Sequence, residues 1–355
     1  MTMRTRYFAI ASLLVLGLGL GTGLVAYYRG FQGALSSPGG PSELQFIPRS
    51  ASIVAFANVQ DVMVSEVRRR LRDASPLESD GQREFEKQTG IVIETDIDRV
   101  VATLAPSSAD DSVPSVGLLL ARGRFDEVKI EGVMREHGAR VDTYKGKRLI
   151  IADQARRLYR PEADPSAGGA SPSAPDGSAP LPPRGDLSLA FLEPGLAAVG
   201  STELVRHAID LKDGGENVTA NGEMMRLVQS LEDGNVWAVG RFDALSAQAR
   251  VPAGVAKQLP PITWFSVAGH VNGGIRATLR VEARDDQSAT DLRAVVRGFA
   301  SLGSLQAASS PALQMLMRSL VIGGSGTTVS LSFDAPAELF DRLGKDLPTA
   351  PGVPR

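Results

Sequence analysis

Two short stretches indicate the fold of this chain: Ala121-Arg122-Gly123-Arg124-Phe125-Asp126 and Ala238-Val239-Gly240-Arg241-Phe242-Asp243. They lie 117 residues apart and agree at five of six positions. Each follows an apolar run of strand length and precedes a helix-like pattern. Glycine permits a sharp turn, phenylalanine can anchor the entering helix, and aspartate favours the positive helix N-terminus. The repeat therefore predicts two related strand-to-helix junctions, and residues 54–59 ahead of Asp61 form a weaker third copy.

The segments around these junctions repeat a second pattern, a β-hairpin followed by a helix. It occurs at residues 187–209, 262–299 and 320–343, each with a glycine-containing turn. Such turns join antiparallel strands. The pattern predicts an α+β fold, in which an N-terminal transmembrane helix is followed by an ectodomain of antiparallel sheet packed with helices, in two related halves.

Apolar spacing also predicts helices near the start of the ectodomain. One of them is capped by Asp61, whose side chain can accept a backbone N–H. Another spans residues 97–104, where apolar side chains recur at the helical positions i, i+3, i+4 and i+7.

The N-terminal part of the chain contains 22 consecutive uncharged, mostly apolar residues, 7–28. At about 1.5 Å per residue, a helix of this length crosses a hydrocarbon core of roughly 30 Å. Arg4 and Arg6 precede it and Arg29 alone follows closely, so the positive-inside rule places the N-terminus in the cytoplasm. A cleaved signal peptide is the alternative, but the run is longer than its usual apolar region and lacks the small-x-small cleavage site. We predict an uncleaved anchor in the inner membrane, with a periplasmic or extracellular ectodomain.

Four glycines lie within this predicted anchor: Gly17, Gly19, Gly21 and Gly23. They form two overlapping small-xxx-small pairs, which let a second helix approach closely. Glycine is also common in membrane helices in general. Two interpretations therefore stay open: the glycines pack two helices into a homodimer, or they have no specific packing role.

Composition divides the rest of the chain. In residues 161–185, 20 of 25 residues are Pro, Gly, Ala or Ser, which predicts a disordered insertion. The predicted order is a cytoplasmic tail (1–6), the anchor (7–28), a flexible stalk (29–42), a first α+β half (43–213), a second α+β half (214–346) and a flexible C-terminal tail (347–355).

The composition also excludes several classes of function. The chain has no cysteine, which removes cysteine nucleophiles, disulfides and Cys-ligated metals. Its 38 basic and 40 acidic side chains, and its 5% of aromatic residues, argue against nucleic-acid binding. The three histidines, His137, His207 and His270, lack metal-ligand spacing, and the motifs of serine hydrolases and P-loops are absent. We expect no catalytic residue, no cofactor and no metal site.

The order of several turn and cap motifs resembles a loosely defined group of membrane-anchored bacterial envelope proteins. These motifs are Thr89-Gly90, Asp96-Ile97-Asp98-Arg99-Val100, Gly123-Arg124-Phe125-Asp126, Tyr144-Lys145-Gly146-Lys147 and Gly200-Ser201. The resemblance covers residues 45–213. It implies a similar α+β ectodomain and a location in the envelope, and it carries over no catalytic residue.

The leading hypothesis is a single-pass envelope protein whose ectodomain binds another protein or an apolar ligand. One alternative is a hydrolase or transferase with a dispersed acidic site formed by Asp126, Asp243 and Asp285. Another is a dimeric membrane scaffold built on the anchor glycines. The expected partners are the lipid bilayer, through residues 7–28, and the protein or apolar ligand; nucleic acid is not expected.

Overall fold

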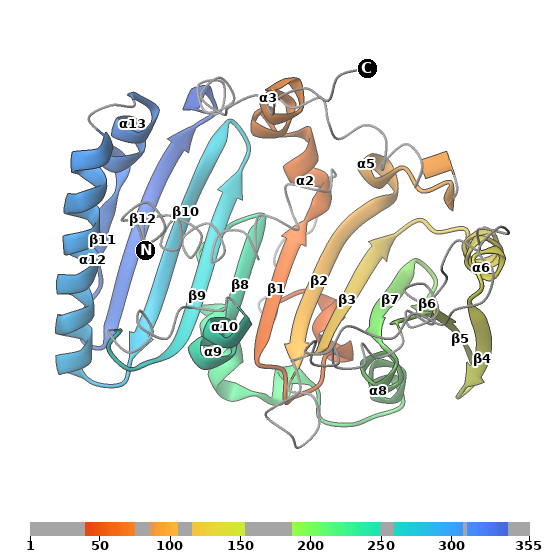
Figure 1. Cartoon of the computed structure of the whole chain (residues 1–355). Helices are drawn as coiled ribbons and strands as arrows, with labels where there is room; N and C mark the ends of the chain where they lie inside the picture. The colour runs from red at the N-terminus through yellow and green to blue at the C-terminus, as the bar shows by residue number, and fades with distance from the viewer. Residues whose placement is uncertain are drawn as a thin grey trace, which may run out of the picture.

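The computed structural model describes residues 40–74, 86–87, 89–105, 116–152, 187–248, 259–307 and 311–339. The strands among these residues form one 12-stranded sheet in the order β11-β12-β10-β9-β8-β1-β2-β3-β7-β6-β5-β4 (Figure 1). Every pairing in this sheet is antiparallel. The predicted α+β class, with a large antiparallel sheet and several helices, is confirmed.

The strands of the single sheet come from both of the predicted α+β halves. The first part supplies β1 (Ile53–Asn58), β2 (Ile97–Ala105), β3 (Val116–Gly123), β4 (Arg140–Tyr144), β5 (Lys147–Ala152), β6 (Leu187–Glu193) and β7 (Leu196–Ser201). The second part supplies β8 (Val236–Arg241), β9 (Ile262–Val271), β10 (Gly274–Ala283), β11 (Val321–Gly323) and β12 (Thr328–Pro336). The two sets meet where β1 pairs with β8. The predicted division at residues 213 and 214 stays a prediction.

One face of the sheet, which we call the covered face, lies under three main elements and the short 3-10 helix η3 (Val218–Ala220), which stands between α8 and α9 in the chain. The three main elements are the 3-10 helix η1 (Ser42–Phe46), α8 (Thr202–Lys212) and α9 (Gly222–Gln229). The side chains of Ser201 and Asn221 accept backbone N–H groups and so start α8 and α9. Apolar side chains of these three main elements pack on β1, β2, β3, β5, β6, β7 and β8 in the largest core cluster.

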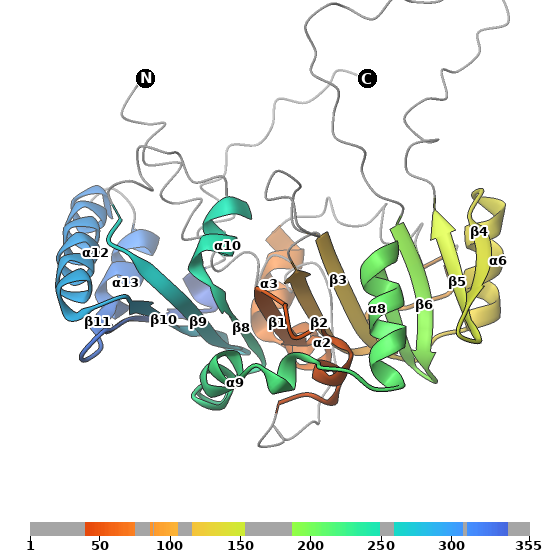
Figure 2. The ribbon, with the colours of Figure 1, turned by 90° about the horizontal axis from the view of Figure 1, so that it is seen from below.

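The opposite face, which we call the helix-rimmed face, carries the other helices. They are α2 (Val59–Val64), α3 (Glu66–Ala74), α5 (Ile93–Asp96), α6 (Glu127–Glu136), α10 (Phe242–Gln248), α12 (Asp286–Gln306) and α13 (Pro311–Ser319). Figure 1 shows them around the margin: α12 lies along one side, α6 along the other, α2 at one end of the strands and α10 at the other. Figure 2 shows that α9 and α10 lie on opposite sides of the sheet.

The repeated stretch forms two equivalent junctions at the ends of β3 and β8. At each, a glycine passes so close to a neighbouring chain that an added Cβ would overlap a carbonyl oxygen: Gly123 meets Asp96, and Gly240 meets Ser52. Asp96 and Ser52 immediately precede β2 and β1. Because β8, β1, β2 and β3 are successive antiparallel neighbours, the two junctions lie at opposite ends of the sheet.

Two local predictions are wrong. Residues 97–105 form the central strand β2 rather than a helix. β2 buries Val100 on one face and Val101 on the other, so its apolar residues do not alternate with polar ones, and their spacing can match a helix by accident. The cap of α2 is Asn58, whose side chain accepts the N–H of Asp61 at 3.2 Å, so Asp61 lies in the first turn.

No helix within the described ranges is long and apolar enough to cross a membrane. The predicted anchor (7–28), with Gly17, Gly19, Gly21 and Gly23, lies outside those ranges, and so it stays a prediction without structural support. The same holds for residues 1–6, for nearly all of the stalk, for the insertion 161–185 and for the tail 347–355.

Candidate functional site

A row of apolar side chains crosses the whole sheet on the helix-rimmed face. It takes one residue from each of the twelve strands, and each residue is the direct cross-strand partner of the next. Direct partners in antiparallel strands point to the same face. This apolar row consists of Val141, Ile150, Leu189, Val199, Leu119, Ala102, Ala55, Ala238, Val267, Leu279, Leu331 and Ile322, from β4 to β11.

Side chains are smallest at the centre of the apolar row. Ala238, Ala55 and Ala102 stand on the adjacent strands β8, β1 and β2, whereas larger aliphatic residues stand toward both edges. A methyl group rises less from a sheet than a leucine side chain, so the surface is lowest at these strands. α2 packs on one side of this centre through Val62, and α10 packs on the other through Leu245.

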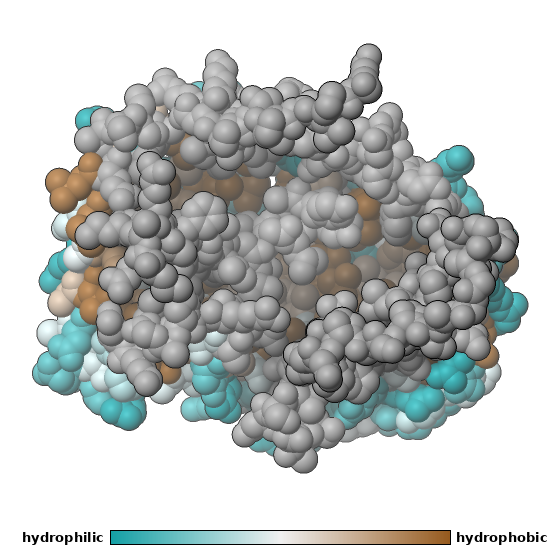
Figure 3. Space-filling model, in the orientation of Figure 1, coloured by the Kyte–Doolittle hydropathy of each residue, from teal (hydrophilic) through white to brown (hydrophobic). Residues whose placement is uncertain are grey.

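Three adjacent residues near the centre of the row are partly exposed although they are apolar, whereas the next residue, Ala238, is 4% exposed. Leu119, Ala102 and Ala55 all have intermediate exposure. On the covered face, their chain neighbours Leu120 and Val101 are each 0% exposed. Figure 3 shows hydrophobic residues in the middle of the helix-rimmed face, between atoms drawn in grey. This difference between the two faces makes the centre of the apolar row the candidate binding site.

The covered face contains a buried group of charges. The Glu43 side chain is 1% exposed, and its carboxylate accepts from the Nε atoms of Arg99 at 3.1 Å and Arg122 at 2.8 Å. Burial raises the pKa of Glu43, but the hydrogen bond from Arg122, a backbone hydrogen bond and the charges of both arginines outweigh it. The net pKa of this carboxyl lies below its ordinary value. The group therefore holds η1 on β2 and β3 as an ionised cluster.

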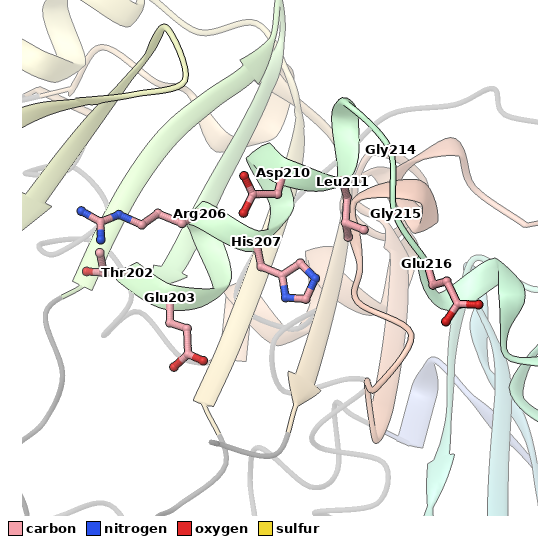
Figure 4. Close-up of a pocket in the computed structure, with 9 residues that line it drawn as sticks. All are labelled: Thr202, Glu203, Arg206, His207, Asp210, Leu211, Gly214, Gly215 and Glu216. Carbon is pink, nitrogen blue, oxygen red and sulfur yellow. The ribbon is translucent and has the colours of Figure 1, made fainter. Parts of the chain in front are cut away.

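A groove of about 580 Å³ lies along the outer side of α8 (Figure 4). Asp210 on this helix accepts from Lys145 at 2.6 Å and from the Tyr144 hydroxyl at 3.1 Å. The hydrogen bond from Lys145 lowers the pKa of Asp210, and the same contact raises the pKa of Lys145. Arg206 and Glu203 also line the groove, so charges of both signs face it, and no ligand charge is favoured.

The first copy of the repeated junction has structural roles. Gly123 makes the close approach described above, and Arg124 donates its backbone N–H to the carbonyl of Asp96 at 2.7 Å. Phe125 packs against Phe191, with ring centroids 6.1 Å apart. Asp126 caps α6 by accepting the backbone N–H of the residue three positions on.

The second copy repeats the backbone geometry but not the cap. Arg241 donates its N–H to the carbonyl of Ser52 at 2.8 Å, next to Gly240. Phe242 is partly exposed at the start of α10. The side chain of Asp243 accepts from Arg241 Nε at 3.1 Å, and this contact lowers the pKa of Asp243. The repeat thus marks how two strands leave the sheet.

The three acids of the enzyme hypothesis are separated by the fold. Asp126 and Asp243 follow β3 and β8, at opposite ends of the sheet. Asp285 accepts the N–H of Ser288 at 2.8 Å and caps α12, which lowers the pKa of Asp285. Each carboxylate has a local role at a helix start. In the described part of the chain, no group of three or more His, Asp or Glu residues is arranged to hold a metal ion.

The histidines do not form a site either. His137 ends α6, with Nδ1 at 2.7 Å from the carbonyl oxygen of Val133. His207 lines the groove on α8, and His270 lies exposed on β9. The three histidines belong to separate elements.

Sequence reasoning missed the apolar row. The signal was present, because Ala55, Ala102 and Ala238 are small apolar residues within strand-like runs. The assignment of residues 97–104 to a helix removed the strand that joins β1 to β3. Without this strand and the register of its neighbours, the residues of the row cannot be placed side by side.

Fold and site together define the class of protein as an open antiparallel sheet with helices on both faces. Helices cover the core on one face, and on the other face the apolar row runs between α2 and α10. No family model matches the chain, and no curated protein matches it. One solved structure, crystal form I of TP0453, superposes with a TM-score of 0.43 and 10% sequence identity, over 88% of this chain and 97% of that one. A similarity of this extent says nothing about what either protein binds.

Proposed function

We propose that this protein binds the acyl chain of a lipid on the centre of the apolar row, outside the cytoplasmic membrane. The observation that carries the proposal is the partial exposure of Ala55, Ala102 and Leu119. Their chain neighbours on the covered face, Val54, Val101 and Leu120, are at most 1% exposed. Exposed apolar area that is bounded by packed elements is typical of ligand-binding surfaces.

The shape and chemistry of the row support an acyl chain. The row is continuous across neighbouring strands at spacings of about 4.8 Å, so a flexible hydrocarbon can lie across the strands and contact one residue of each. No member of the row carries a polar side-chain atom. An acyl chain makes no hydrogen bonds, so it leaves no polar group unsatisfied on such a surface.

The predicted membrane anchor supports the same ligand, because it would hold the ectodomain next to a source of lipid. The enzyme hypothesis has no comparable support, since its acids stand at separate helix starts. The homodimer packed through Gly17 to Gly23 stays a separate prediction.

Photolabelling tests the proposal. Full-length protein in lipid nanodiscs is exposed to a palmitic acid that carries a diazirine at the end of its chain, and the labelled residues are mapped by mass spectrometry. We expect adducts on the parts of β1, β2 and β3 that contain the row. Absence of adducts from these strands would reject the proposal.

A pair of variants makes the test specific. Ala102→Phe fills the lowest part of the surface and should reduce labelling of these strands severalfold. Ala294→Phe adds the same atoms at an exposed position of α12 and should leave the labelling unchanged. Circular dichroism verifies that both variants are folded. Equal labelling of the two variants would contradict binding at the row.

A further inference from the structure

A second apolar surface lies on α12, away from the row. Phe299, Leu302 and Leu305 are exposed by 40%, 45% and 74%. Residues three apart are neighbours on a helix surface, so these three form one stripe. We call it the α12 stripe. The sheet-facing side of the helix is separate and is formed by Ala289, Leu292 and Val296.

The half of α12 that carries the stripe has few polar groups. In residues 294–306, Arg297 is the single charged side chain, and carboxylates are absent. The hydroxyls of Ser301 and Ser304 donate to the carbonyls of Arg297 and Ala300, both at 2.9 Å. Ser301 therefore keeps its hydrogen bond when water is removed beside the stripe, and Ser304 lies on the side of the helix away from Leu302.

We propose that the α12 stripe lies on the surface of the lipid bilayer. An amphipathic helix with bulky apolar residues on one side enters the boundary between headgroups and acyl chains. Arg297 lies about 80° around the helix from Leu305, at the border of the stripe and not within it. In a half of the helix without carboxylates, its positive charge attracts an anionic membrane surface over about a Debye length.

The length of the chain allows this contact. The predicted apolar segment ends at Tyr28 and the described structure begins at Gly40, so eleven residues, 29–39, lie between them. The twelve residue-to-residue steps from Tyr28 to Gly40 reach about 40 Å when the chain is extended. β1, which follows η1, and β12, on which α12 packs, are four positions apart in the sheet, which corresponds to about 19 Å along the sheet. η1 and α12 lie on opposite faces, so roughly 10 Å on each side of the sheet is added, and the separation stays below about 40 Å. A chain held at its N-terminal segment can therefore place α12 on the same membrane.

The absence of native cysteine gives a direct test. A single cysteine is introduced into the full-length chain as Leu302→Cys, in the stripe, or as Ser304→Cys, about 200° further around the same turn. Each variant is labelled with the environment-sensitive dye NBD and reconstituted into vesicles of phosphatidylethanolamine and phosphatidylglycerol. Nitroxide-bearing lipids should quench the label at position 302 about threefold more than the label at position 304.

A further substitution verifies that the stripe is responsible. Adding Leu305→Glu to the Leu302→Cys chain should bring its quenching down to that of position 304. Equal quenching at the two positions overturns the proposal. Protection of position 302 from aqueous iodide without quenching by nitroxide lipids also overturns it, because the stripe would then contact protein.

Discussion

The two faces of the sheet differ although the same strands build both. On the covered face, Val101 and Leu120 are fully buried beneath η1, α8 and α9. On the helix-rimmed face, their chain neighbours Ala102 and Leu119 are partly exposed, and the helices pack near the ends and edges of the strands. Burial that is complete stabilises a fold, whereas apolar area that stays accessible can serve binding. The comparison teaches that the most completely buried core lies on one face of the sheet and the accessible apolar area near its centre lies on the other.

The largest expected effect comes from the charges under η1. Glu43→Ala leaves Arg99 and Arg122 without their shared carboxylate in a largely buried position. We expect the free energy of unfolding to fall by about 3 kcal/mol, measured by urea denaturation followed by tryptophan fluorescence. Glu216→Ala removes an exposed carboxylate from Arg49 and should cost about 0.5 kcal/mol or less. Similar losses for the two variants would contradict the role of Glu43.

Two adjacent residues of β3, Leu119 and Leu120, test the difference between the two faces of the sheet. Leu120→Ala opens a cavity in the core of the covered face and should cost about 3 kcal/mol. Leu119→Ala removes the same atoms from the apolar row and should cost about 1 kcal/mol, because its side chain is already partly in contact with water. Denaturation midpoints at unchanged slope measure both values. If Leu119→Ala is as damaging as Leu120→Ala, the helix-rimmed face is an ordinary core.

The smallest expected effect is a pH dependence that belongs to the covered face. The pKa of Glu43 is lowered in the folded protein, so its stabilisation is present above the pKa of the unfolded chain and is lost as pH falls through the folded value. The stability difference between wild type and Glu43→Gln should stay constant from about pH 6 to 8 and shrink below about pH 4.5. Acid titration of both proteins by circular dichroism measures this difference, and a difference that grows in acid would refute the assignment.

Local sequence patterns were enough to predict the turns and junctions of this fold. An apolar run before Gly123, and another before Gly240, indicated a strand that ends in a turn. Both segments have this structure, as the ends of β3 and β8. Ser201 was recognisable as a cap because it precedes an apolar helical pattern. These features depend only on residues within a few positions of one another.

The features that were missed depend on distant partners. The spacing of the apolar residues in 97–104 predicted a helix, but these residues form a strand whose Arg99 pairs with Glu43, 56 residues earlier in the chain. The partners of Ala55 in the apolar row include Ala238, which is paired through β8. Neither pairing has a local signal, so the central strand and the candidate site emerge only from the register of the whole sheet.

The pairing of β1 with β8 also governs the order of events during folding. Residues 53–57 of β1 bond to residues 236–240, so one edge of β1 has no partner until most of the chain has been made. Closing so long a loop is slow, because its entropy is lost before the strand contacts form. During that interval β1 presents an apolar, unpaired edge, which is a template for association with other chains. We therefore expect correct folding to require that β1 is kept from associating with other chains until β8 has been synthesised.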